Sequence, residues 1–183
     1  MTDVNELRAK HYGNPLEDDP GAGARRQRLQ QYGLARSGVV ELDSFAADFA
    51  KEVRQMAGGT PYTMVNLFFD GDAEPVQYFA GLHDPHGGMS RTMGLDQGFC
   101  AHVVRRRKAL QLDDVCDYPR FGVNPALDLL NIRTYLGAPI VDADGTVIGT
   151  VCTVDTDVKE YGSDGVDFIK SKAAAALDLV KTR

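Results

Sequence analysis

The chain has 183 residues, enough for one ordinary domain, and its 43% hydrophobic and 25% charged residues are typical of a globular protein. Its net charge of -6 argues against non-specific nucleic-acid binding and against a polybasic membrane anchor, because both need a basic surface. The sequence also lacks an apolar stretch near the roughly 20 residues of a membrane span and a secretory signal. Three unevenly spaced cysteines favour reduced thiols over a disulfide framework, so we expect a cytoplasmic protein.

The N-terminal region is predicted to be an irregular arm over residues 1–22, followed by a single domain over residues 23–183. Asparagine, aspartate, proline and glycine residues in the arm favour turns over a helix. We expect the arm to be mobile or to lie against a partner subunit. Helical character begins near Ala24, continues to Tyr32 and stops at Gly33.

The clearest helix comes next, where apolar residues recur every three or four positions and so share one face. These residues are Leu42, Phe45, Phe49, Val53 and Met56. Asp43 or Ser44 is expected to cap the start of this helix through a side-chain oxygen. Gly58-Gly59 is expected to end it.

Strands and loops alternate through the middle of the chain. Runs rich in β-branched and aromatic residues predict strands, and Asp-Gly pairs predict tight turns. The expected strands are residues 62–69, 76–80, 109–112, 135–142 and 146–155. Core candidates in the last two strands are Val141, Val147, Ile148, Val151 and Val154. Residues 81–97 are expected to form a long loop, residues 98–107 a short helix, and residues 113–133 a loop that holds a short helix over 125–130.

A final helix is expected over residues 163–181, with Asp164 in its first turn, where a negative charge suits the helix dipole. Its apolar residues again share one face: Val166, Ile169, Ala173, Leu177 and Val180. The order of the expected elements predicts an α+β fold, in which an antiparallel sheet carries helices on one face.

Several segments, taken in order, resemble one family of sensory domains. Residues 28–34 resemble its first helix, and Phe99-Cys100-Ala101-His102 resembles a helix that borders its pocket. The segments DVCDYPRFGVNP at 114–125, IRTYLGAPI at 132–140 and GTVIGTVCTVD at 145–155 follow with similar spacing. From residue 25 onward, the chain resembles the GAF domains of bacterial sensor kinases and cyclases.

This resemblance implies a central antiparallel sheet of roughly five or six strands with the N- and C-terminal helices on one face. On the other face, the helix near residue 100 and the loop over 113–133 would cover a pocket. The family commonly binds cyclic nucleotides, tetrapyrroles, haem or small metabolites there, and commonly dimerises through its terminal helices. We therefore expect a small-molecule ligand and a homodimer. The sequence identifies neither the ligand, nor a cofactor, nor the downstream signalling protein, and predicts no nucleic-acid or membrane partner.

The residues expected to contact the ligand combine aromatic walls with a few polar groups, as small-molecule pockets do. They are Phe79, Phe99, Cys100, His102, Asp114, Phe121, Asn124, Arg133 and Tyr135. A structural alternative remains open for Asp114 and Arg133, which would pair with each other or cap backbone within the long loop.

Among the candidate residues, Cys100 has the side chain best suited to chemical reaction. If the short helix begins at Gly98, free N–H groups of its first turn would favour the thiolate, as in a redox or electrophile sensor. The alternative is a small core residue on the pocket floor. The free methionine sulfoxide reductases of the family have a cysteine at this position, but residues 120–125 lack the resolving cysteine that their chemistry needs.

The sequence also contains candidate ligands for a metal ion and for haem. Cys100 and His102 would point in different directions on a helix, and adding Cys116 matches no common zinc spacing, so no metal site is predicted. His83 or His86 would suit haem iron as a ligand, with Met89 or Met93 as the second axial ligand. The alternative is that these residues belong to an exposed polar loop.

The favoured function is a sensory domain that holds a small molecule in its pocket and passes the signal on through its terminal helices. One alternative is a dimerisation or protein-interaction module with a vestigial pocket, supported by the small residues Ala173–Ala176. A second is a thiol redox enzyme of the free methionine sulfoxide reductase type, and an enzyme is the less favoured outcome. An occupied pocket would favour the sensor. A pocket filled by the protein's own side chains would favour the interaction module.

Overall fold

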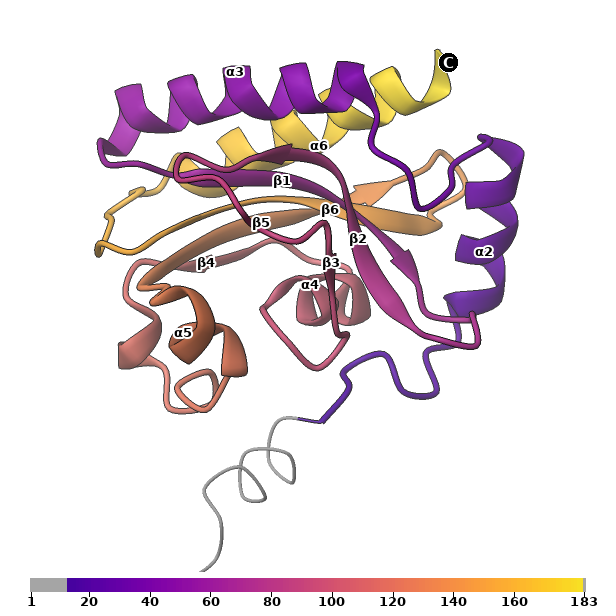
Figure 1. The fold of residues 1–183 in the computed structure, drawn as a ribbon, viewed down its shortest axis with the longest axis horizontal. Helices are drawn as coiled ribbons and strands as arrows, with labels where there is room; N and C mark the ends of the chain where they lie inside the picture. The colour runs from indigo at the N-terminus through magenta and orange to yellow at the C-terminus, as the bar shows by residue number, and fades with distance from the viewer. Residues whose placement is uncertain (1–12, 183) are drawn as a thin grey trace, which may run out of the picture.

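The computed structural model describes residues 13–182, which form an antiparallel sheet with helices on both faces (Figure 1). The sheet has six strands in the order β3-β2-β1-β6-β5-β4. Their bounds are β1 Tyr62–Phe69, β2 Val76–His83, β3 Thr92–Met93, β4 Leu110–Leu112, β5 Thr134–Val141 and β6 Val147–Asp155. The predicted α+β fold is confirmed. Residues 1–12 of the predicted arm lie outside the described residues, and the domain boundary at residue 22 stays a prediction.

The two long helices cover one face of the sheet, and the short helices lie on the other (Figure 1). The long ones are α3 Val40–Ala57 and α6 Gly165–Lys181. The short ones are α4 Cys100–Arg106, α5 Pro125–Leu130 and the 3-10 turn η1 Val115–Asp117, whereas α2 Ala22–Gln31 lies beside one end of the sheet. Leu29 of α2 belongs to the core under α3 and α6. None of the helices within residues 13–182 combines the length and the apolar character needed to cross a bilayer.

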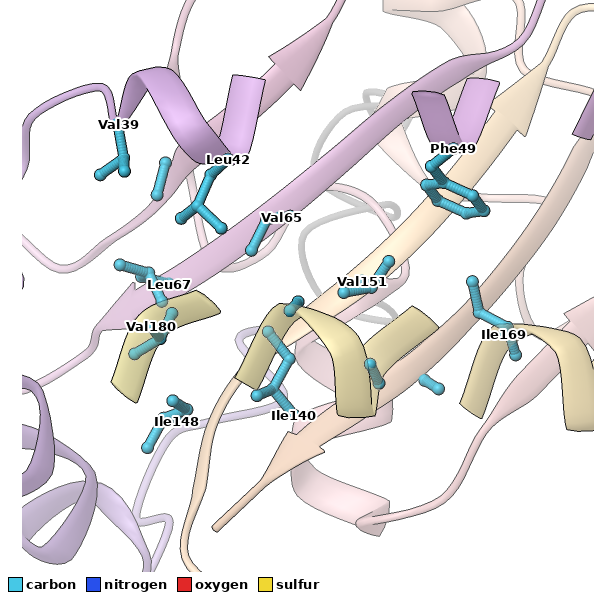
Figure 2. Close-up of a cluster of buried hydrophobic side chains, with 14 of the residues drawn as sticks. Val39, Leu42, Phe49, Val65, Leu67, Ile140, Ile148, Val151, Ile169 and Val180 are labelled. Carbon is cyan, nitrogen blue, oxygen red and sulfur yellow. The ribbon is translucent and has the colours of Figure 1, made fainter. Parts of the chain in front are cut away.

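Each face of the sheet has its own hydrophobic core, because successive side chains of a strand point to opposite faces. Under α3 and α6, Val65 and Leu67 of β1 and Ile140 of β5 belong to one core cluster with Phe49 and Ile169 (Figure 2). On the opposite face, Phe79, Phe99 and Tyr135 belong to the second core, which α4 and α5 cover. The two-sided burial explains why β6 is buried along its whole length.

Several local predictions need correction. Neither Asp43 nor Ser44 caps α3, because the helix begins earlier, after Val39, whose N–H donates to the Ala80 carbonyl. Asp43 instead accepts a hydrogen bond from the Leu82 N–H, which ties α3 to β2. Val141, predicted to be a core residue, and Met56, predicted to lie on the apolar face of its helix, are both 40% exposed.

The predicted loop over 81–97 is shorter than expected, because β2 continues to His83 and residues 92–93 pair with it as β3. Both edges of the sheet are therefore short strands, β3 with two residues and β4 with three.

Candidate functional site

A chamber lies between the sheet and its cover of α4 and α5, where the sequence predicted a pocket. Its volume is about 30 Å³, close to the space that one water molecule needs. The lining residues come from five strands, both short helices and the connecting loops: Met64, Asn66, Gln77, Phe79, Met89, Met93, Gly98, Phe99, Cys100, Ala126, Leu130, Ile132, Tyr135, Cys152 and Val154. The protein's own side chains therefore fill most of this space.

Aromatic rings form one wall of the chamber, as predicted. The Phe99 ring lies 5.0 Å from the Tyr135 ring and 5.6 Å from the Phe121 ring, measured between centroids. Tyr135 can lie flat over β5 because residue 137 is a glycine, where a Cβ would collide with the Tyr135 hydroxyl. Phe79, Phe99 and Tyr135 line the chamber, whereas Phe121 packs behind Phe99.

The floor of the chamber carries an amide in an otherwise apolar setting. Asn66 on β1 is buried, and its Nδ2 donates to Cys100 Sγ at 2.9 Å and to Thr150 Oγ1 at 3.2 Å. Its Oδ1 has no hydrogen-bond partner among residues 13–182. Either orientation of the amide leaves one of its two polar atoms unpaired, which is uncommon for a buried group and costs stability.

Two buried thiols meet beside this amide. Cys100, the first residue of α4, places its Sγ 3.4 Å from the Sγ of Cys152 on β6 and 3.3 Å from the Tyr135 hydroxyl. Burial acts to raise the pKa of Cys100, but hydrogen bonds with Cys152, Thr150, Tyr135 and Asn66 outweigh it and lower that pKa. The hydrogen bond with Cys100, together with burial, raises the pKa of Cys152 well above its ordinary value.

These opposite shifts make Cys100 the more acidic of the two thiols and favour Cys152 as the thiol that keeps its proton. The predicted position of Cys100 in the first turn of its helix is confirmed. The low pKa has a different cause from the predicted one, because side-chain hydrogen bonds rather than the start of a seven-residue helix supply it.

His102 does not line the chamber. Its ring packs edge-on against Phe121 at a centroid distance of 5.3 Å. Burial and the nearby charges of Arg120 and Arg106 lower the pKa of His102 to about 4. Cys116 is exposed on η1, whereas Cys100 is buried, and residues 13–182 contain no cluster of three metal-ligating side chains.

The remaining predicted polar contacts hold the cover together rather than line the chamber. Asn124 caps α5 by accepting from the Ala126 N–H, and its side chain also bonds the backbone of Gly98, just before α4. Asp114 accepts two hydrogen bonds from Arg133, at 3.1 and 2.5 Å, and one from the Cys116 N–H. The structural alternative for Asp114 and Arg133 therefore describes their contacts.

The loop over the chamber is anchored through its backbone. Gln77 Nε2 donates to the carbonyls of Gly94 and Gln97, at 2.9 and 2.7 Å. Met89 of this loop and Met93 of β3 line the chamber, whereas His83 and His86 do not. A chamber of about 30 Å³ would have to enlarge many-fold to hold a haem.

Sequence reasoning missed Asn66 and Cys152. A polar asparagine inside the apolar run of residues 62–69 was a signal for Asn66. For Cys152, the available signal was its position two residues before Val154 on the same strand, which places both side chains on one face of the sheet. Nothing local indicated that Cys100 faces Cys152.

The chain is similar to known proteins in sequence. The GAF domain family matches residues 41–177. A stretch of 91 residues is 28% identical to the cyclic di-GMP phosphodiesterase PA2567 of Pseudomonas aeruginosa, covering 45% of this chain and 16% of that protein. The chain thus spans well under two thirds of the length of this relative.

Solved structures share the fold. The GAF domain of an Acinetobacter phosphoenolpyruvate-protein phosphotransferase has a TM-score of 0.57 at 14% identity, covering 91% of this chain and 96% of that chain. The type II free methionine-R-sulfoxide reductase of Thermoplasma acidophilum also has a TM-score of 0.57, at 13% identity, covering 77% of this chain and 93% of that chain. At these identities the likeness concerns the fold alone.

Proposed function

The chain belongs to the GAF domain family, and on that premise we propose that it is a bacterial, cytoplasmic sensory domain whose chamber opens to bind a small molecule. The observation that carries the proposal is the unpaired end of the Asn66 amide, buried at the floor of an apolar chamber. Binding pockets typically combine apolar walls with a few polar groups of this kind. The ligand would be mostly apolar, with one hydrogen-bonding group directed at Asn66.

The chamber as described is closed, so binding requires its cover to move. Met89, Met93 and Leu130 line it and are only partly buried. Methionine side chains are flexible and adapt readily to irregular shapes. Outward movement of these side chains would enlarge the chamber while Gln77 continues to hold the backbone of the loop.

A route from the chamber to the terminal helices runs through β5. Tyr135 faces the chamber, whereas Leu136 and Ile140 on the opposite face of the same strand pack in the core under α6. A ligand that displaces the Tyr135 ring would shift β5 and so α6. This route supports signal transmission through the terminal helices, provided that the two arrangements differ in ligand affinity.

Native mass spectrometry of freshly purified protein, compared with its denatured mass, tests this function. We expect an added small-molecule mass on each chain. Leu130→Phe would fill the chamber and remove that mass. Leu129→Phe should keep it, since Leu129 is the preceding residue of α5 and is 62% exposed. Equal added mass in both variants would contradict binding in the chamber.

The competing function is an interaction module with a vestigial pocket, which the small chamber favours. A groove of about 690 Å³ beside α6 is lined by Val141, Val166, Ala174 and Leu177, among others. Sedimentation velocity should then show a dimer, and native mass spectrometry should show no added small-molecule mass. Ala174→Arg should weaken this dimer more than Ala175→Arg. A monomer at micromolar concentration would contradict this alternative.

A further inference from the structure

The two thiols at the chamber floor belong to different elements and meet only in the folded protein. Cys100 opens α4 and Cys152 lies within β6, and their Sγ atoms are 3.4 Å apart. The sulfurs of a disulfide lie about 2.05 Å apart, so they would need to approach by roughly 1.3 Å. We propose that Cys100 and Cys152 form a reversible disulfide when a small peroxide reaches the chamber, which makes this domain a thiol-based oxidant sensor.

The surroundings of the pair suit the first step of this chemistry. Thiolates rather than thiols attack peroxides. Asn66 Nδ2 and the Tyr135 hydroxyl lie within hydrogen-bond distance of Cys100 Sγ, where they stabilise a negative charge on that sulfur. Cys152 has the higher pKa of the two and holds its proton until the second step, as a resolving thiol should.

The reaction balances with peroxide as the oxidant. The Cys100 thiolate attacks one peroxide oxygen, the O–O bond breaks, and the departing hydroxide takes up a proton to become water, leaving a sulfenic acid. The Cys152 sulfur then loses its proton and attacks the Cys100 sulfur, the S–O bond breaks and a second water leaves. Two thiols lose two electrons, and one peroxide becomes two waters.

Disulfide formation would change the domain because it joins the cover of the chamber to the sheet. It would link α4, part of the chamber cover, directly to β6 in the centre of the sheet. The cover could then no longer move away from the sheet at this point. The inference goes beyond the proposed function, since the bond can form whether or not a ligand enters the chamber.

Stoichiometric hydrogen peroxide, followed by denaturation in N-ethylmaleimide and mass spectrometry, tests the proposal. The Cys116→Ser variant is the starting protein, because Cys116 is exposed and would react with other molecules. We expect a mass loss of about 2 Da, no maleimide on Cys100 or Cys152, and a cross-linked peptide pair that dithiothreitol separates. In the same background, Cys152→Ala should leave a sulfenic acid on Cys100 that dimedone traps.

Tyr135→Phe should slow cross-linking by roughly three- to ten-fold, because it removes one hydrogen bond to the Cys100 sulfur. Oxidation of Met93, which lines the chamber, reports separately whether the peroxide has arrived. Maleimide on both Cys100 and Cys152 after treatment would overturn the proposal, most directly in molecules whose Met93 is already a sulfoxide. This readout needs no ligand, so its failure is distinguishable from failure of the proposed sensory function.

Discussion

The Tyr32 hydroxyl donates a hydrogen bond to the carboxylate of Asp142 at 2.6 Å, and this contact joins the end of α2 to the turn between β5 and β6. The same carboxylate pairs with Arg28 of α2 at 3.1 Å and with Lys181 of α6 at 2.9 Å. Asp142 therefore connects the first and last described helices through one buried side chain.

Asp142→Asn should reduce the dependence of stability on acidic pH. Burial acts to raise the pKa of Asp142, but hydrogen bonds from Tyr32 and Lys181 outweigh it and hold that pKa at about 2, below the usual 3.8. A lowered carboxylate pKa stabilises the fold above the ordinary value, and this contribution is lost as pH falls from about 4 to about 2. Urea unfolding across this range measures the effect. The variant should lose less stability over it than wild type, and exposed Asp167→Asn should behave as wild type.

His102→Phe should remove a loss of stability at mildly acidic pH. The pKa of His102 is lowered from 6.5 to about 4, so the unfolded chain binds a proton that the folded protein does not accept. Wild-type stability should therefore fall as pH decreases from about 6.5 to about 4, by about 3 kcal/mol from this residue. Thermal unfolding of both proteins at several pH values measures the difference. Parallel curves for the two proteins would show that His102 takes up its proton in the folded state.

Replacing Asp70 should destabilise the fold much more than replacing Asp72, although both residues follow β1 closely. The Asp70 side chain is only 3% exposed and pairs with the buried Arg25 at 2.9 Å, whereas Asp72 pairs with Arg36 at the surface. Among residues 13–182, Asp70→Ala leaves Asp19 as the carboxylate partner of Arg25, and it should destabilise the fold by about 3 kcal/mol. Asp72→Ala should cost less than about 1 kcal/mol. The two free energies of unfolding, measured side by side, would contradict this explanation if they were equal.

Gly137→Ala should destabilise the protein through Tyr135. The added Cβ would collide with the Tyr135 hydroxyl and push the ring out of the chamber wall, which should cost about 1–3 kcal/mol. Gly23→Ala is the matched control, because Gly23 lies in α2 with nothing within 4 Å of an added Cβ. The control should be neutral or stabilising by up to about 1 kcal/mol. Equal effects at both positions would contradict a specific role for the space at Gly137.

Elements set by local chemistry could be predicted closely from the sequence. β1 was predicted to the residue, because an aromatic and β-branched run ends at Asp70-Gly71. The same holds for α5, where Asn124 caps the helix and Pro125 is its first residue. The start of α3 was missed because a tertiary hydrogen bond from Val39 to β2 decides it.

The candidate site was predicted only in part, since it depends on contacts between distant segments. The aromatic wall followed from the resemblance, and three of its four predicted residues line the chamber. Contact between Cys100 and Cys152 depends on the packing of α4 on β6, which no local pattern encodes. The size of the chamber depends on how side chains such as Met93 pack, which the sequence does not specify.

The short strands β3 and β4 have a consequence for how this domain recognises others. Long, exposed sheet edges act as templates for an incoming strand, whether from a peptide or from an aggregating copy. Edge strands of two and three residues offer few unpaired backbone groups for such pairing. Strand addition and edge-to-edge aggregation are thereby disfavoured, so recognition falls to the side chains of helices and loops.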